Sequence, residues 1–93
     1  MNDRQRALCE RALKAWGVQR QLDMVIEEMA ELRKAIMKYR RGQGDKLDLL
    51  REGVDVQIMV MHLETLFPPS DWEFELIQKL ARVQDRLDKR GGS

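Results

Sequence analysis

Four acidic residues, arranged in two pairs, are the side chains of this sequence best suited to chemistry. Glu28 and Glu31 are three residues apart, and so are Glu52 and Asp55. Residues at this spacing share one face of a helix, so each pair would present two carboxylates side by side. Both pairs lie in apolar stretches, where unpaired carboxylates are costly. Because Mg²⁺ prefers oxygen ligands and bridges to phosphates, the pairs predict a magnesium site, with Mn²⁺ as a substitute.

The elements that carry these acids are predicted to be helices. Two adjacent prolines and a few glycines divide the chain, and no segment shows sustained strand alternation. We expect helices at about residues 3–16, 19–40 and 46–67, a last helix that starts near Ser70, and a frayed tail at 91–93. The expected N-caps are Asp3, Asp45 and Ser70, the last in a capping box with Glu73.

The predicted fold is all-α, an antiparallel helical bundle of three substantial helices and a shorter N-terminal one in a single domain, 1–93. Antiparallel packing of the second and third helices would bring all four carboxylates together. The second half of the third helix, VQIMVMHLETLF, is apolar almost all round. In so short a chain, this composition indicates burial against a second subunit.

Composition narrows the class of partner. The chain has 93 residues, and 17 Lys and Arg against 16 Asp and Glu leave a net charge of +1. This balance gives no reason to expect nucleic-acid binding. No apolar run is long enough to cross a membrane, and the N-terminus lacks a signal-peptide core. With a single cysteine, the chain is expected to be cytoplasmic. His62 is expected to be a hydrogen-bonded core residue.

The residues around the acids resemble a known enzyme family. IEEMAELRKAI and LREGVDVQIMV are similar to the E-x-x-E and E-x-x-D motifs of the MazG-like branch of the all-α nucleoside triphosphate pyrophosphohydrolases. The superfamily also includes dimeric dUTPases and phosphoribosyl-ATP pyrophosphohydrolases. The resemblance covers roughly residues 21–67, about half of the chain, and includes the doubled Glu27-Glu28 and the Lys34-Ala35-Ile36 that follows.

The resemblance implies hydrolysis of a nucleoside triphosphate, ribo or deoxy, to monophosphate and pyrophosphate, with water attacking the α-phosphorus. It implies homodimers or homotetramers in which paired subunits complete a four-helix bundle core, and Lys34 as a phosphate contact. Lys79 and Arg86 match the first and last residues of a K-x-x-x-N-x-x-R element that binds nucleotide in the family. Val83 occupies the position of the Asn in this element. This departure puts the substrate selectivity and the catalytic rate in question. The catalytic and metal-binding residues implied are Glu28, Glu31, Glu52 and Asp55.

Two alternatives belong to other classes. A non-catalytic oligomeric helical module could keep the fold and bind a nucleotide or a protein partner. A di-iron carboxylate bundle is less suited, because such sites use Glu-x-x-His twice and the only histidine does not follow a glutamate at that spacing. The sequence does not determine which nucleobase or sugar the substrate carries, or whether the protein is a dimer or a tetramer. It also does not distinguish removal of unwanted nucleotides from a role in a biosynthetic pathway.

Overall fold

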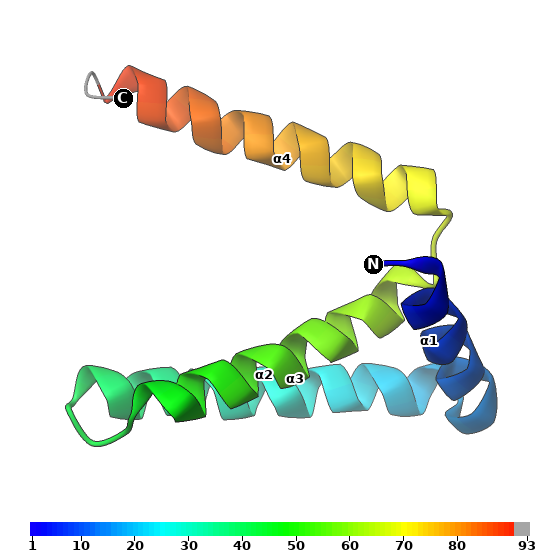
Figure 1. The fold of residues 1–93 in the computed structure, drawn as a ribbon, viewed down its shortest axis with the longest axis horizontal. Coiled ribbons are helices and arrows are strands. Elements are labelled where there is room, and N and C mark those ends of the chain that lie inside the picture. The colour runs from blue at the N-terminus through cyan, green and yellow to red at the C-terminus, as the bar shows by residue number, and fades with distance from the viewer. Residues whose placement is uncertain (91–93) are drawn as a thin grey trace.

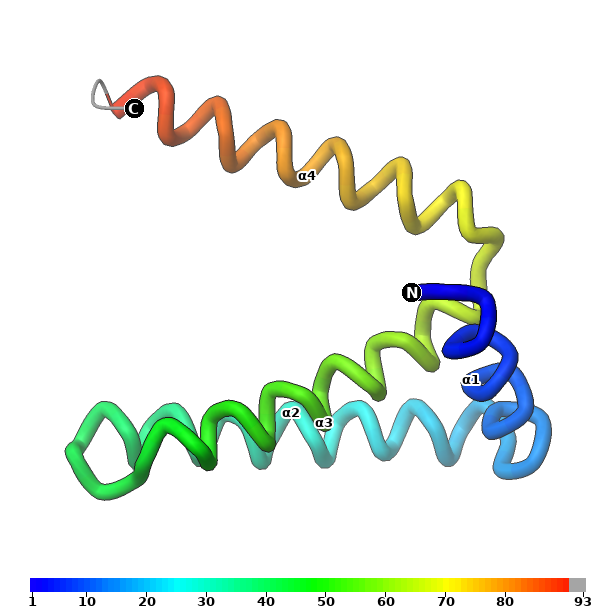
Figure 2. The backbone as a smooth tube through the Cα atoms, in the orientation of Figure 1, coloured from blue at the N-terminus to red at the C-terminus, as the bar shows by residue number. Residues whose placement is uncertain are grey.

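The computed structural model describes residues 1–90 and consists of four α-helices joined by short turns (Figure 1; Figure 2). The described residues contain no strand, and none of their helices is long and apolar enough to cross a membrane. The predicted all-α class is therefore confirmed, while the predicted fraying of 91–93 lies outside the described residues. The helices are α1 (Asp3–Trp16), α2 (Val18–Arg40), α3 (Lys46–Glu64) and α4 (Pro69–Lys89).

A capping box starts α1 one residue before the predicted cap. The Asn2 side chain accepts a hydrogen bond from the Gln5 backbone N–H, and the Gln5 side chain accepts one from the Asn2 N–H. The prediction of Asp3 as N-cap was wrong because Asn2 has the reciprocal partner three positions on, whereas Asp3 lies in the first turn. Gly17 separates α1 from α2 with a φ of 87°, a conformation that glycine adopts without steric cost.

The turn from α2 to α3 brings the acidic helices together as an antiparallel hairpin (Figure 1). Gly42 supports this turn with a φ of 73°. Asp45 then caps α3 by accepting hydrogen bonds from the backbone N–H groups of Leu47 and Asp48, as predicted. The helix ends at Glu64, earlier than expected, because the next residues form tighter turns.

The start of α4 differs from the prediction. Ser70 is not an N-cap, and the predicted box with Glu73 does not form, because the helix already begins at Pro69. Proline suits the first helical position, since its fixed φ is helical and it has no N–H to leave unpaired. Pro68 therefore stands at the N-cap position and provides no side-chain hydrogen bond.

The core lies where α1, α2 and α3 meet. α2 and α3 pack along their length, and α1 crosses both at the end of the hairpin distant from its turn (Figure 2). Each helix contributes one buried apolar side chain, namely Cys9, Val25 and Met59. Gln21 and His62 are also buried. Burial raises the pKa of the Cys9 thiol, with the charges of nearby glutamates acting in the same direction, so this cysteine is a packing residue.

The fourth helix stands away from this core. It has no buried residue and makes at most a marginal contact with the other helices (Figure 1). The radius of gyration is 16.3 Å, whereas a compact domain of this length would have about 12 Å. Residues 1–90 therefore form four helices, but α4 does not pack with the other three into a common core. A four-helix core would need a further surface against which α4 could pack.

Candidate metal centre

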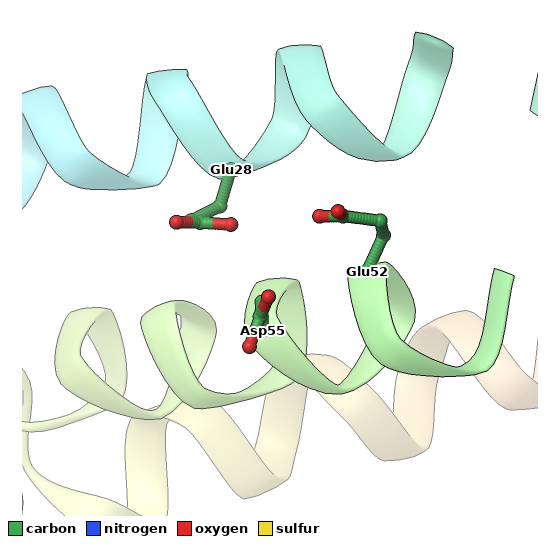
Figure 3. A group of neighbouring side chains, drawn as sticks. All are labelled: Glu28, Glu52 and Asp55. Atoms are coloured by element: carbon green, nitrogen blue, oxygen red, sulfur yellow. The ribbon is translucent and has the colours of Figure 1, made fainter. Parts of the chain in front are cut away.

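Three of the four predicted acids converge between α2 and α3. Glu28 on α2 and Glu52 on α3 point toward one another, and Asp55 lies nearly one turn further along α3 (Figure 3). One carboxylate oxygen from each of the three lies within 4.8 Å of the others. Glu28 and Glu52 are partly buried and Asp55 is exposed. The antiparallel packing of α2 and α3 therefore brings one acid of the first motif close to both acids of the second motif, which neither helix could do alone.

The electrostatic effect of this convergence is clearest at Glu28. Partial burial raises the pKa of this carboxyl group above its ordinary value, and the charges of Asp55 and the other neighbouring acids raise it further. Within residues 1–90, none of the three acids forms an ion pair with a lysine or arginine. The centre is therefore an uncompensated concentration of negative charge, which a cation would relieve.

The three side chains fit a hard divalent cation. Carboxylate oxygens are the donors that Mg²⁺ prefers, and opposite ligands of an octahedral Mg²⁺ are about 4.2 Å apart. The 4.8 Å span of the three oxygens is only slightly wider, so small rotations of flexible glutamate side chains would close the set. No cysteine or histidine ligand adjoins the acids, which argues against a soft-metal site among the described residues.

The fourth acid, Glu31, is not part of this three-residue group. It lines an adjoining open depression of about 210 Å³, together with Glu52, Asp48 and two cations of α2, Lys34 and Lys38. The predicted phosphate contact, Lys34, therefore lies beside the acids. Lysines next to a metal centre can hold the outer phosphates of a polyphosphate as point charges.

Asp48 is a lining residue that the sequence interpretation missed. It precedes Glu52 by four positions, so the two share a face of α3, and this spacing was the signal that could have identified it. Its carboxylate extends the negative surface toward the hairpin turn. The depression therefore offers acids from both helices and cations from α2 alone.

The predicted nucleotide-binding residues of the last helix lie elsewhere. Lys79 and Arg86 are both on α4, which stands apart from the hairpin that carries the acids. Lys79 instead lines an apolar pocket of about 400 Å³ near the start of α4, with Phe67, Trp72 and Leu76 among its neighbours. One chain therefore does not bring these two cations together with the acidic centre.

His62 confirms the expectation of a core residue. It is buried, and its Nδ1 donates a hydrogen bond to the backbone carbonyl of Ile58 at 2.8 Å. It does not belong to the group of possible metal ligands. Gln21 is also buried, and its Nε2 has no hydrogen-bond partner among residues 1–90. No family model, curated protein or solved structure matches this chain.

Proposed function

We propose that this protein is a magnesium-dependent pyrophosphohydrolase that converts a nucleoside triphosphate to its monophosphate and pyrophosphate. The observation that carries the proposal is the convergence of Glu28, Glu52 and Asp55 from two helices within 4.8 Å. Isolated acidic pairs on solvated helix faces are common, but acids that meet across a helix pair, without cationic partners, are costly unless a ligand joins them. The MazG-like motifs at the same positions support this choice of reaction.

The residues have distinct roles in the proposed reaction. The three converging acids hold the metal, and bound Mg²⁺ would neutralise charge on the phosphoryl oxygens. Lys34 and Lys38 hold the β- and γ-phosphates in the adjoining depression. Glu31 lies beside the metal ligands without belonging to their group, so we assign it to accept a proton from the attacking water.

The bond changes follow from attack at the α-phosphorus. The water oxygen bonds to that phosphorus as its proton passes to the carboxylate, and the bond from the α-phosphorus to the bridging oxygen breaks. Pyrophosphate leaves with the bridging oxygen and the electron pair. The monophosphate therefore keeps the oxygen that came from water. The exposed apolar surface of the chain supports the accompanying proposal that the protein acts as a homo-oligomer.

Pyrophosphate release from a panel of ribo- and deoxynucleoside triphosphates, with and without Mg²⁺, tests the proposal. We expect turnover only with Mg²⁺ and a loss of at least about a hundredfold in Asp55→Asn and Glu31→Gln. Glu27→Gln is the matched control, because Glu27 is exposed and lies outside the converging group, so its activity should be unchanged.

The same experiment separates the enzyme from the non-catalytic module. If no triphosphate yields pyrophosphate while Mg²⁺ and nucleotide together still raise the melting temperature, the protein is a nucleotide-binding module. If Asp55→Asn and Glu31→Gln both keep the wild-type rate, the assignment of the residues is wrong. Val83, at the position of the motif asparagine, is the residue to exchange for Asn when substrate preference is compared.

A further inference from the structure

α4 presents an apolar stripe that residues 1–90 of the same chain leave exposed. Leu76, Leu80 and Val83 repeat at helical spacing, and each is about half exposed. Ile77 widens the stripe on one side and is also exposed. An amphipathic helix in water is stabilised mainly by packing of its apolar face, so this stripe needs a partner surface.

A matching surface lies on the α2–α3 hairpin. It is an apolar groove of about 270 Å³, and its lining residues are Met29, Leu32, Arg33, Ile36, Met37 and Val56. At about 100° per residue, the α2 residues of the groove lie on the side of the helix opposite to Glu31 and Lys38, which line the acidic depression. A helix seated in the groove would therefore leave the depression beside Glu31 and Lys38 open to substrate.

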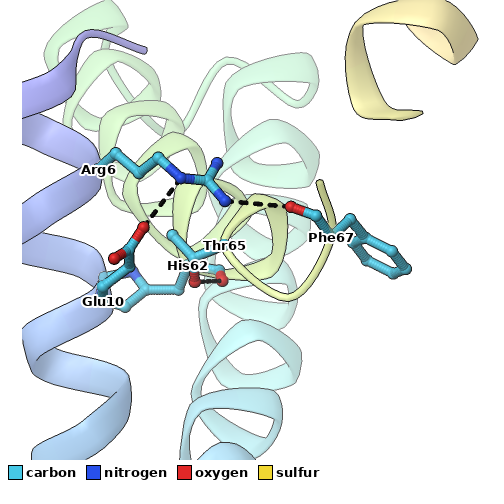
Figure 4. Close-up of polar contacts among 5 residues, drawn as sticks. All are labelled: Arg6, Glu10, His62, Thr65 and Phe67. Carbon is cyan, nitrogen blue, oxygen red and sulfur yellow. Dashed lines mark hydrogen bonds and ion pairs between the residues drawn. The ribbon is translucent and has the colours of Figure 1, made fainter. Parts of the chain in front are cut away.

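The segment between α3 and α4, residues 65–68, which we call the elbow, holds α4 away from the groove of its own chain. Arg6 of α1 donates a hydrogen bond to the Phe67 carbonyl at 3.1 Å and pairs with Glu10 at 2.9 Å (Figure 4). Phe67 and Pro68 each precede a proline, which disfavours the helical backbone conformation, and Pro68 is extended with ψ 140°. α4 and the hairpin consequently extend from this elbow in diverging directions, and the distance between them increases away from it (Figure 1).

The solvent-exposed area of the chain indicates how much surface a partner would have to bury. The chain exposes 7691 Å², whereas a compact monomer of 11.0 kDa would expose about 5,600 Å². The excess is about 2,000 Å² per chain, or about 4,000 Å² for two chains, which falls within the range of obligate homodimer interfaces. A second copy of this chain is therefore an occupant of sufficient size.

The two apolar surfaces also carry complementary charges. Arg33 falls between Met29 and Met37 on α2, within the groove. Glu73 falls between Leu80 and Ile77 on the helical surface of α4, within the stripe. Within the described residues, neither Arg33 nor Glu73 forms an ion pair. Packing of the stripe into the groove would bring these opposite charges into one interface.

We propose that two copies of this chain exchange their fourth helices, so that the α4 stripe of each copy packs in the α2–α3 groove of the other and Arg33 pairs with Glu73 across the interface. The exchange is reciprocal and produces a closed dimer with two-fold symmetry, because each chain provides one α4 stripe and one α2–α3 groove. It does not depend on the hydrolytic reaction, because the residues that line the groove and the residues of the α4 stripe have no role in that reaction.

Charge reversal with mixing of variants tests this arrangement. By light scattering after size exclusion, the wild-type protein should have twice the chain mass of 11.0 kDa. Arg33→Glu and Glu73→Arg each create a like-charge pair at both contacts and should weaken dimerisation at least about tenfold. In a mixture of the two variants, the groove of the Arg33→Glu copy receives the α4 of the Glu73→Arg copy, and the other contact keeps the native charges. Because opposite charges then meet at both contacts, the dimer should return.

Matched controls reverse a charge on the opposite side of each helix. Arg20→Glu on α2 and Glu75→Arg on α4 should keep the wild-type dimer, and circular dichroism should show unchanged helix content in all variants. A monomeric wild-type protein would overturn the proposal. Single variants that stay monomeric after mixing would overturn it too, because the two charges then do not meet across an interface. Single variants that dimerise as tightly as the wild type would place the interface elsewhere.

Discussion

Replacement of Glu28 by Gln should stabilise the protein in the absence of metal. The pKa of Glu28 is raised in the folded chain, so its ionised form opposes folding at neutral pH. Glutamine keeps the size of the side chain and removes the charge. A substitution at the candidate metal centre that increases stability would show that the acids are placed together at an energetic cost.

The distances between the acids set the size of the effect. Two unit charges 4.8 Å apart repel by about 0.9 kcal/mol in a medium as polar as water. Glu28→Gln removes two such repulsions, with Glu52 and with Asp55, and salt screening reduces their sum to about 1 kcal/mol. In a domain of this length, that free energy corresponds to a rise in melting temperature of about 4–8 °C.

Thermal melts at equal protein concentration measure this change. The gain should be full at neutral pH and should shrink as the pH falls toward the ordinary Glu value of 4.5, because the wild-type carboxyl group then takes up a proton. Mg²⁺ should raise the melting temperature of the wild-type protein and have less effect on Glu28→Gln. Glu27→Gln, on the exposed neighbour, is the comparison and should give a smaller rise, because Glu27 contributes least to the raised pKa of Glu28. A Glu28→Gln protein that melts at or below the wild-type temperature would show that the charge of Glu28 does not oppose folding.

Further substitutions probe the cap, the core and the phosphate contacts. Asp45→Ala removes the α3 cap and should lower stability by about 1 kcal/mol, visible in urea unfolding; an unchanged midpoint would contradict the role of the cap. Gln21→Leu removes a buried, unpaired Nε2 and should raise the urea midpoint; a lower midpoint would show that the amide has a partner. Lys34→Ala and Lys38→Ala should each raise the KM for triphosphate about tenfold, whereas Lys14→Ala on α1 should not; equal KM values would remove the lysines from the substrate site.

The helices could be predicted because their signals are local. Asp45 directly before an apolar segment indicated the cap of α3, and Gly17 indicated the break between the first two helices. The errors arose where neighbouring residues compete for one role. Asn2 and Asp3 are both good caps, and Gln5 decides between them. At α4, the stop signal of Pro69 also serves as the first helical residue, which displaced the expected cap.

The site could be predicted only in part, because its geometry depends on packing between helices. The motifs identified four acids, but the register of the hairpin decides that Glu28 meets Glu52 and Asp55 while Glu31 lies beside them. Periodicity also showed which side of α4 is apolar. It could not show that α4 stands away from the rest of its own chain, because this depends on the elbow and on the contact of Arg6 with the Phe67 carbonyl, 61 residues away in sequence.

In the proposed reaction, water attacks the α-phosphorus of a nucleoside triphosphate at the acidic centre formed by Glu28, Glu52 and Asp55. The most direct test is hydrolysis in water enriched in oxygen-18, with the products analysed by mass spectrometry. We expect one heavy oxygen in the monophosphate and none in the pyrophosphate, only when Mg²⁺ is present, and at least about a hundredfold less labelled product from Asp55→Asn. Heavy oxygen in the pyrophosphate, or no labelled product from any triphosphate, would contradict it.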